Sequence, residues 1–203
     1  MRTLLLFTLL YPMISFAQDS IFYEHGSLKA YGIIEDGKKE GEWSYFYPGG
    51  ELSAHFEYIH DNMDGEQIYY DIDGSILGIE NWQHGLLEDS ARYFYPDGTI
   101  EKLGIYDQGL YTGKWTFFYE NGNLKRSGYY KEGTPDSLWH FYHENGLLNQ
   151  VGAFNEGKEH GVWKYFDLDG DQTYEGSFID GEKSGQWYFF KRSGKKKKWK
   201  YFD

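Results

Sequence analysis

Residues 152–170 read GAFNEGKEHGVWKYFDLDG, and this stretch decides the fold. It contains a Gly-x-aromatic triplet, a turn bearing glycine, a Gly-x-Trp triplet, paired aromatic residues and a second turn. The same pattern recurs 24 residues earlier and 24 residues later. A fixed period between about 20 and 50 residues is typical of repeat proteins. The repeated glycine, tryptophan and turn-glycine positions are Gly104, Gly128, Gly152 and Gly176; Trp43, Trp115, Trp139, Trp163 and Trp187; and Gly26, Gly50, Gly74, Gly98, Gly122, Gly146, Gly170 and Gly194.

Each repeat predicts two strands. In the first repeat we expect strands at residues 28–34 and 42–47, joined by a turn at residues 35–39. The strand predictions rest on short aromatic or β-branched runs bounded by Gly, Asn, Asp and Pro. Pairs such as Asp36-Gly37 tolerate the positive φ that tight hairpins need. We therefore predict an all-β fold, an elongated single-layer antiparallel sheet of stacked β-hairpins built from 24-residue repeats.

The spacing of glycine and tryptophan predicts how a hairpin is packed. A turn centred near residues 37–38 places Gly32 opposite Trp43, and the same offset places Gly152 opposite Trp163. The large indole ring can then lie across a glycine backbone on the neighbouring strand, an arrangement that protects weak glycine positions in sheets. The five tryptophans and their glycines are therefore predicted to be structural.

Composition limits the class of protein. The chain has 203 residues, 21% aromatic side chains and no cysteine. Its aromatic content argues against disorder, because disordered chains are poor in aromatic residues. A formal net charge of −12 argues against a nucleic-acid partner bound through phosphate neutralisation. The absence of cysteine excludes disulfides, thiolate metal sites and a cysteine nucleophile.

The N-terminus has the layout of a secretory signal peptide. Arg2 precedes an apolar run at residues 4–14, and Ser15 and Ala17 supply small residues before a cut at Gln18. We predict a signal peptide at residues 1–17 and an exported, periplasmic or extracellular chain. A buried N-terminal strand and an uncleaved anchor are the alternatives. Residues 18–203 would then form about seven full repeats and a truncated last one.

Repeats two and three depart from the pattern. Gln67 and Ala91 occupy the tryptophan position, while Phe56 and Glu80 occupy the glycine position. One interpretation is drift in repeats that their neighbours hold in place. The other is a specialised surface across residues 51–98, since stacked arrays often vary at a binding face. The second interpretation predicts a partner surface that contains Phe56, Tyr58, Tyr69, Tyr70, Trp82 and Tyr93.

The C-terminus carries a basic run in an otherwise acidic chain. One interpretation is a charged edge strand, because lysines commonly protect a sheet edge from pairing. The other is a patch for anionic lipid or an acidic partner, with aromatic side chains adding interfacial contact. The residues of this candidate patch are Lys195, Lys196, Lys197, Lys198 and Trp199.

No residue cluster predicts catalysis, a metal or a cofactor. His60 and His84 share one turn position in adjacent repeats, two strands or roughly 10 Å apart, too far to ligate one ion. The run from Asp167 to Asp171 is the best calcium candidate, but it lacks EF-hand spacing and coincides with the repeat's Asx-type turn. Nucleophile-elbow, phosphate-loop and zinc motifs are missing.

The repeat resembles a known family. The segments GIYDQGLYTGKW at residues 104–115, GAFNEGKEHGVW at residues 152–163 and GSFIDGEKSGQW at residues 176–187 resemble the MORN repeat (membrane occupation and recognition nexus) in its bacterial variant. That variant occurs in proteins classed as YwqK-type antitoxins of toxin–antitoxin systems. The resemblance implies an elongated sheet of stacked hairpins used for protein or lipid contact, without a catalytic site. The export signal departs from a cytosolic antitoxin, so any toxin target would be an exported effector.

Three functions remain open from the sequence, and an enzyme is the least favoured class. The first is an exported scaffold that binds a protein through aromatic side chains, which are favoured at interface centres. The second is association with a membrane or envelope surface through Lys195–Trp199. The third is binding of a glycan on exposed Trp and Tyr rings.

Overall fold

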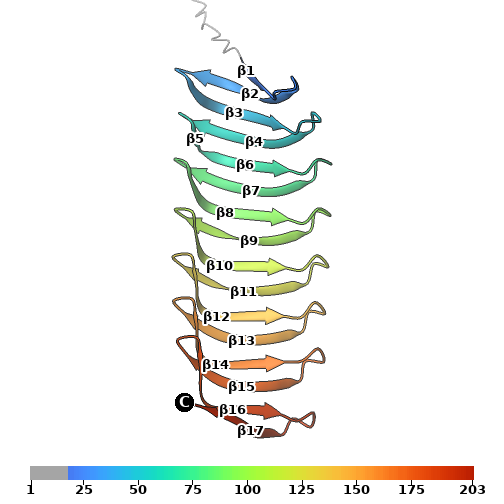
Figure 1. Cartoon of the computed structure of the whole chain (residues 1–203), viewed down its shortest axis with the longest axis vertical. Coiled ribbons are helices and arrows are strands. Elements are labelled where there is room, and N and C mark those ends of the chain that lie inside the picture. The colour runs from blue at the N-terminus through green and yellow to red at the C-terminus, as the bar shows by residue number, and fades with distance from the viewer. Residues whose placement is uncertain (1–17) are drawn as a thin grey trace, which may run out of the picture.

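The protein is a single antiparallel sheet of 17 strands, described here by a computed structural model over residues 18–203 (Figure 1). Each strand pairs with the next along the chain, except that β5 and β6 both pair with β4, so hairpins stack in sequence order from β1 to β17. The predicted all-β fold of stacked hairpins is confirmed. The predicted signal peptide at residues 1–17 lies outside the described residues. Within residues 18–203 no helix has the length and apolar character needed to cross a membrane.

The strands have the following bounds: β1 Asp19–Phe22, β2 Leu28–Glu35, β3 Lys38–Phe46, β4 Leu52–Ile59, β5 Asn62–Met63, β6 Gly65–Tyr70, β7 Ile76–Gln83, β8 Leu86–Phe94, β9 Ile100–Asp107, β10 Leu110–Phe118, β11 Leu124–Lys131, β12 Thr134–Tyr142, β13 Leu148–Asn155, β14 Lys158–Phe166, β15 Gln172–Ile179, β16 Glu182–Phe190 and β17 Lys196–Phe202. Strand β4 pairs with both β5 and β6, which form one strand interrupted at Asp64.

Two kinds of turn join the strands, one kind along each long edge of the sheet. Between β2 and β3 the turn has two central residues, Asp36 with φ 49° and Gly37 with φ 77°. Positive φ at both residues is the geometry of a type I′ hairpin, which the Asp-Gly pair predicts. Between β8 and β9 only Gly98 has positive φ, and its N–H donates to the Tyr95 carbonyl at 2.9 Å. The same Asp-Gly sequence therefore serves two turn geometries.

The predicted strand boundaries need one correction. The turn expected at residues 35–39 contains only Asp36 and Gly37, and β3 begins at Lys38 rather than residue 42. Gly41 has φ 64° but does not end the strand. It forms a β-bulge, which bends a strand and re-aims its side chains without breaking it.

This bulge explains the Gly-x-Trp motif. Val151 pairs with Lys164, and Ala153 pairs with His160, so Gly152 alone faces residues 161–163 of β14. The bulge glycine at position 161 has φ 72°. The extra residues swing the Trp163 side chain back over the strand that precedes it.

The predicted packing of indole on glycine is confirmed by contact. A Cβ added at Gly152 would overlap the ring carbons of Trp163, whose Nε1 donates to the Ala153 carbonyl at 3.1 Å. Only 2% of Trp163 is exposed. The ladder register is different from the predicted one, since Trp139 is the direct ladder partner of Gly152. The same ring contact joins Gly32 to Trp43, Gly104 to Trp115, Gly128 to Trp139 and Gly176 to Trp187.

The tryptophans define one face of the sheet, here called the Trp face. Side chains alternate between faces along a strand, so Trp43 and Tyr45 lie on this face while Ser44 and Phe46 lie on the opposite face. Edge-to-face contacts continue along the Trp face from one repeat to the next, as between Phe154 and Trp163 with ring centroids 5.1 Å apart. Within residues 18–203 this aromatic row is the core, and no second layer of secondary structure covers it.

Candidate functional site

In the two degenerate repeats, a larger side chain in the glycine position compensates for a smaller side chain in the tryptophan position. Ala91 takes the tryptophan position and is 1% exposed, while Glu80 takes the glycine position on the paired strand. In the repeat before it, the buried Gln67 replaces tryptophan and Phe56 replaces glycine. The Gln67 amide accepts from the Glu57 N–H at 3.0 Å and donates to the Glu57 carbonyl at 3.2 Å. Gly and Trp are lost together because either alone would leave a clash or a gap.

Glu80 is the centre of a hydrogen-bonded cluster on the Trp face. Its Oε2 accepts from the Tyr69 hydroxyl at 2.8 Å and from the Trp82 indole N–H at 2.9 Å. Its Oε1 accepts from the Tyr93 hydroxyl at 2.5 Å, and Tyr93 lies 3.2 Å from the Tyr106 hydroxyl. Only 9% of Glu80 is exposed, so the carboxylate lies below the rings that donate to it. These four residues, Tyr69, Glu80, Trp82 and Tyr93, are called the Glu80 cluster below.

The phenols of this region are held in the neutral form. Burial, followed by the hydrogen bond to Glu80, raises the pKa of Tyr69 and of Tyr93 well above the ordinary value of 10.0. Burial also raises the pKa of Tyr58 and of Tyr106. Farther along the face, burial raises the pKa of Tyr165 to about 12. Neutral phenols can donate to a carboxylate, so the cluster stays assembled at neutral pH.

The predicted partner surface is divided between the two faces. Phe56, Tyr58, Tyr69, Trp82 and Tyr93 lie on the Trp face, and the Phe56 and Tyr69 ring centroids are 5.0 Å apart. Their exposure differs, since Tyr58 is only 6% exposed. The sixth predicted residue, Tyr70, follows Tyr69 directly in β6, so its side chain lies on the opposite face.

The sequence did not identify Glu80 as the centre of this group. It did mark Glu80 as the residue in the glycine position and Ala91 as its partner. A carboxylate on a face otherwise made of rings was the available signal. Trp82 lies two residues along the same strand, whereas Tyr69 and Tyr93 come from the strands on either side, which only the strand register reveals.

Basic side chains lie over several rings of the Trp face. The Lys39 Nζ is 4.8 Å from the ring centroid of Tyr58, and the Lys102 Nζ is 4.2 Å from that of Tyr93. Arg126 lies 4.2 Å over Phe117, and Lys183 lies 4.5 Å over Trp187. Such cation–π contacts are electrostatic and favour positive charge over the ring faces.

The basic C-terminal run does not form a single patch. The Lys196 Nζ lies 2.6 Å from Glu175 Oε1, and this ion pair lowers the pKa of Glu175. Lys196 and Lys198 pair with residues of the opposite face, whereas Lys197 pairs with Phe189 of the Trp face. Trp199 packs on Tyr174 of the Trp face, with centroids 5.1 Å apart and 47% of Trp199 exposed. Lys195 lies in the turn before β17.

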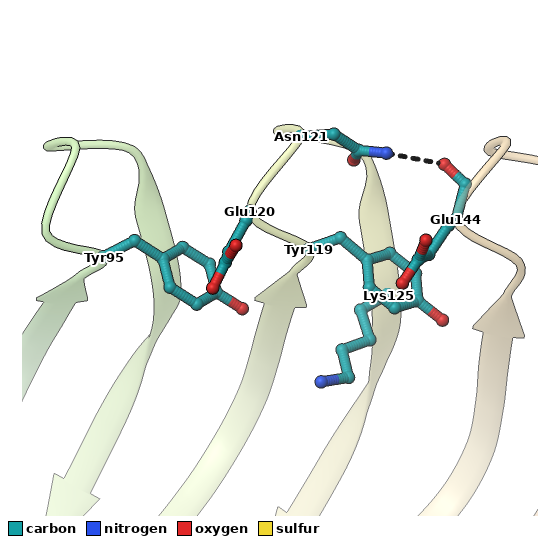
Figure 2. Close-up of a pocket in the computed structure, with 6 residues that line it drawn as sticks. All are labelled: Tyr95, Tyr119, Glu120, Asn121, Lys125 and Glu144. Carbon is teal, nitrogen blue, oxygen red and sulfur yellow. Dashed lines mark hydrogen bonds between the residues drawn. The ribbon is translucent and has the colours of Figure 1, made fainter.

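One hollow of about 470 Å³ lies at the edge of the sheet (Figure 2). Tyr119 and Tyr95 line it, and each hydroxyl donates to a carbonyl 23 residues ahead at 2.8 Å. Asn121 donates to the Glu144 carbonyl at 2.9 Å. Tyr23 and Tyr47 make the same bond in other repeats. The hollow is therefore part of a seam that joins consecutive repeats.

The carboxylates and histidines described in residues 18–203 include no group of three that could hold a metal ion. Asp167 Oδ1 accepts from the Asp169 N–H at 3.1 Å and the Asp171 N–H at 2.9 Å, as an Asx-type turn requires. His60 and His84 sit in turns and lie 3.8 and 3.6 Å from Glu40 and Asp64 respectively.

Comparison with protein families gives one match. The MORN repeat variant family matches residues 39–60 and 111–132, which cover β3–β4 and β10–β11 with their turns. Two repeats are thus of the MORN variant type, and the 24-residue period extends the same pattern along the array. The family match does not identify the YwqK-type antitoxin subfamily. No curated protein matches the sequence.

Solved structures offer only remote likenesses. The crystal structure of TcdB2-TccC3-Cdc42 is 11% identical over 85% of this chain, with a TM-score of 0.20. The crystal structure of TcdB2-TccC3 is 10% identical, also with a TM-score of 0.20. The chain spans 13% of the length of each of these two. Virginiamycin B lyase from Staphylococcus aureus is 11% identical over 92% of this chain and 74% of its own, with a TM-score of 0.19. These scores are too low to assign a shared fold.

Proposed function

We propose that this chain is an exported, non-catalytic repeat scaffold that binds a protein partner on its Trp face. One observation carries the proposal: half-buried aromatic rings follow one another along this face without a covering layer in residues 18–203. Large aromatic side chains are favoured at the centres of protein interfaces. Repeat sheets also supply extended surfaces. The match of two repeats to the MORN variant supports a binding scaffold.

The position of the partner surface follows from the departures in the repeat. Residues 51–98 contain the Glu80 cluster, whereas the other repeats present the same Trp-on-Gly contact again and again. We place the partner's main contact there, on Phe56 and the Glu80 cluster. The signal layout of residues 1–17 supports export, and an antitoxin-like or immunity-like role would make the partner an exported effector.

The test is affinity capture with residues 18–203 as bait and an envelope extract of the source cells. A Trp-face variant carries Phe56→Ser and Trp82→Ser. A matched control carries Tyr129→Ser and Leu138→Ser, two side chains on the opposite face that are each 51% exposed. We expect one protein to be retained by the wild type and the control but lost with the Trp-face variant. Equal retention by all three baits, or a loss confined to the control, would contradict the proposal.

A second candidate function is contact with an anionic surface through the C-terminal end. Exposed lysines at positions 195, 196 and 198 and the half-exposed Trp199 favour it. Anionic lipids attract such basic clusters within a Debye length. Sedimentation with phosphatidylserine vesicles should fall when Lys195–Lys198 are replaced by alanine. Binding that survives these replacements would remove this candidate.

A further inference from the structure

The Trp face supplies its own cations to some rings and not to others. Lys39, Lys102, Arg126 and Lys183 each lie over a ring of this face. Among the described residues, no such cation lies over Phe56, Tyr69 or Trp82. These three rings come from β4, β6 and β7, which are neighbours in the sheet.

The same place holds a carboxylate that only neutral groups contact. The donors to Glu80 are two phenols and an indole N–H. No lysine, arginine or histidine described in residues 18–203 lies within ion-pair distance of it. The nearest cation by ring contact is Lys102, over Tyr93, and the Tyr111 hydroxyl already holds its Nζ at 3.1 Å. A negative charge beside partly exposed rings that carry no cation makes this part of the Trp face attractive to a cation.

We propose that Tyr69 and Trp82, which donate to the buried Glu80 carboxylate, and Phe56, which packs against Tyr69, form a box that takes the guanidinium group of an arginine on a protein partner. The proposal rests on the proposed function and names the chemistry of the partner's central contact. Ring faces attract cations, and a carboxylate beneath the rings adds to that attraction. Arginine fits better than lysine because its planar, weakly hydrated guanidinium stacks on aromatic rings.

The charge of the whole chain points the same way. A formal net charge of −12 draws basic partners towards the sheet and increases their rate of association. The two neighbouring cations of the face, Lys39 and Lys102, are each engaged by a tyrosine hydroxyl. Between them, Phe56, Tyr69 and Trp82 offer a partner arginine rings over which the described residues place no cation.

The test uses the Trp82 indole N–H as a reporter, because it donates directly to Glu80. Residues 18–203 are labelled with 15N-tryptophan, and the Trp82 resonance is assigned from its absence in Trp82→Phe. The probes are N-acetyl-arginine amide and N-acetyl-citrulline amide, which differ in charge but hardly in shape. We expect the arginine probe to shift the Trp82 resonance in a saturable way, with an affinity at least five-fold higher than that of citrulline. Equal shifts by the two probes would overturn the proposal.

Two variants test the role of the carboxylate. Glu80→Gln should weaken binding of the arginine probe at least five-fold. Glu159→Gln is the matched control, since Glu159 pairs with Phe154 on the same face but lies far from the box. Unchanged binding in Glu80→Gln, or an equal loss in both variants, would contradict the proposal. If Glu80→Gln fails to fold, the comparison of arginine with citrulline on the wild type decides alone.

A third probe separates a protein partner from a lipid. Phosphocholine also carries a cation that aromatic boxes bind. Binding of phosphocholine more tightly than the arginine probe would overturn the assignment to a protein side chain. The probe-binding experiments and the affinity capture can fail separately. Partner capture that is insensitive to Glu80→Gln would remove only the box, whereas arginine binding without partner capture would remove only the scaffold function.

Discussion

Gly152 is the residue at which the packing of this sheet is easiest to follow. Its missing side chain leaves room for the Trp163 indole, and the bulge at Gly161 aims the indole there. The ring then hydrogen-bonds the Ala153 carbonyl and becomes 98% buried in a sheet that has only one layer. Burying an aromatic ring of this size is a large apolar contribution for one residue. Glycine is therefore required at this position by contact, not by its φ angle.

We predict that Gly152→Ala lowers the free energy of unfolding by about 1–3 kcal/mol, because the added Cβ overlaps the Trp163 ring and overpacks the contact. Urea denaturation followed by tryptophan fluorescence measures the change. Gly78→Ala is the control, because its added Cβ would lie 3.1 Å from Tyr93 Cδ1, whereas the Cβ added at Gly152 overlaps the Trp163 ring. Gly78→Ala should lower the free energy of unfolding by less than Gly152→Ala does. In the double variant Gly152→Ala with Trp163→Ala, the cost should be smaller than the sum of the two single changes.

The buried phenols predict a loss of stability at alkaline pH. Folding raises the pKa of Tyr58, Tyr69, Tyr93 and Tyr106 above the ordinary value of 10.0, so the unfolded chain loses these protons first. This contribution to stability is present in full below about pH 10 and is lost as pH rises through the folded pKa values. Urea midpoints measured from pH 8 to pH 11 should be flat and then fall. Tyr93→Phe should reduce the slope of the unfolding free energy against pH by up to the contribution of one proton. Tyr129→Phe, at an exposed site, should leave that slope unchanged. A steeper fall in Tyr93→Phe would contradict the argument.

At the scale of the strand and hairpin, the sequence predicted more than it did at the scale of the site. The Asp36-Gly37 pair and the aromatic run before Pro48 are local signals, and local signals were enough for strands and turns. The bulge was not predicted, since Gly41 reads equally well as the end of a turn. The division of Tyr69 and Tyr70 between faces follows from strand alternation and could have been found. The full Glu80 cluster could not, because Tyr69 and Tyr93 reach Glu80 only through the register of three strands.

The bulge position itself gives a prediction. Glycine holds it at residues 41, 65, 113, 161 and 185, whereas Asp89 in β8 and Ser137 in β12 hold it with φ 61° and 60°. A non-glycine residue is destabilised by roughly 1–2 kcal/mol in this left-handed region. Replacing it by glycine removes that strain, but glycine loses more conformational entropy on folding, which cancels part of the gain in stability. Ser137→Gly should therefore raise the free energy of unfolding by about 0.5–1 kcal/mol in urea denaturation. Ser177→Gly, in a strand without positive φ, should lower it. A loss of stability in Ser137→Gly would show that its hydrogen bond to Asp136 matters more than the backbone strain.

At the scale of the whole molecule, the array is a ladder in which each hairpin contacts only its neighbours. Strands lie about 4.8 Å apart, and β5 and β6 share one position, so the sheet extends roughly 72 Å, in keeping with the elongated shape in Figure 1. Seams at both edges repeat with the hairpins, as in the bond from the Gly133 N–H to the Tyr111 carbonyl at 3.0 Å. Stability in such arrays is close to a sum of repeat and neighbour contributions. A partner on the Trp face can therefore contact several repeats without rearranging any of them.

The ladder predicts which deletions the chain tolerates. Removing residues 128–151 joins Ser127 to Gly152, and both halves of the new strand keep their direction, their face and the Trp163 contact. Small-angle X-ray scattering should show a folded chain about 10 Å shorter, the width of two strands. Removing residues 128–139 instead joins the first half of β11 to the last half of β12, which run in opposite directions. Circular dichroism should show loss of β structure in the second deletion and not in the first. Equal loss in both would mean that 24 residues are a repeat of sequence without being the unit of folding.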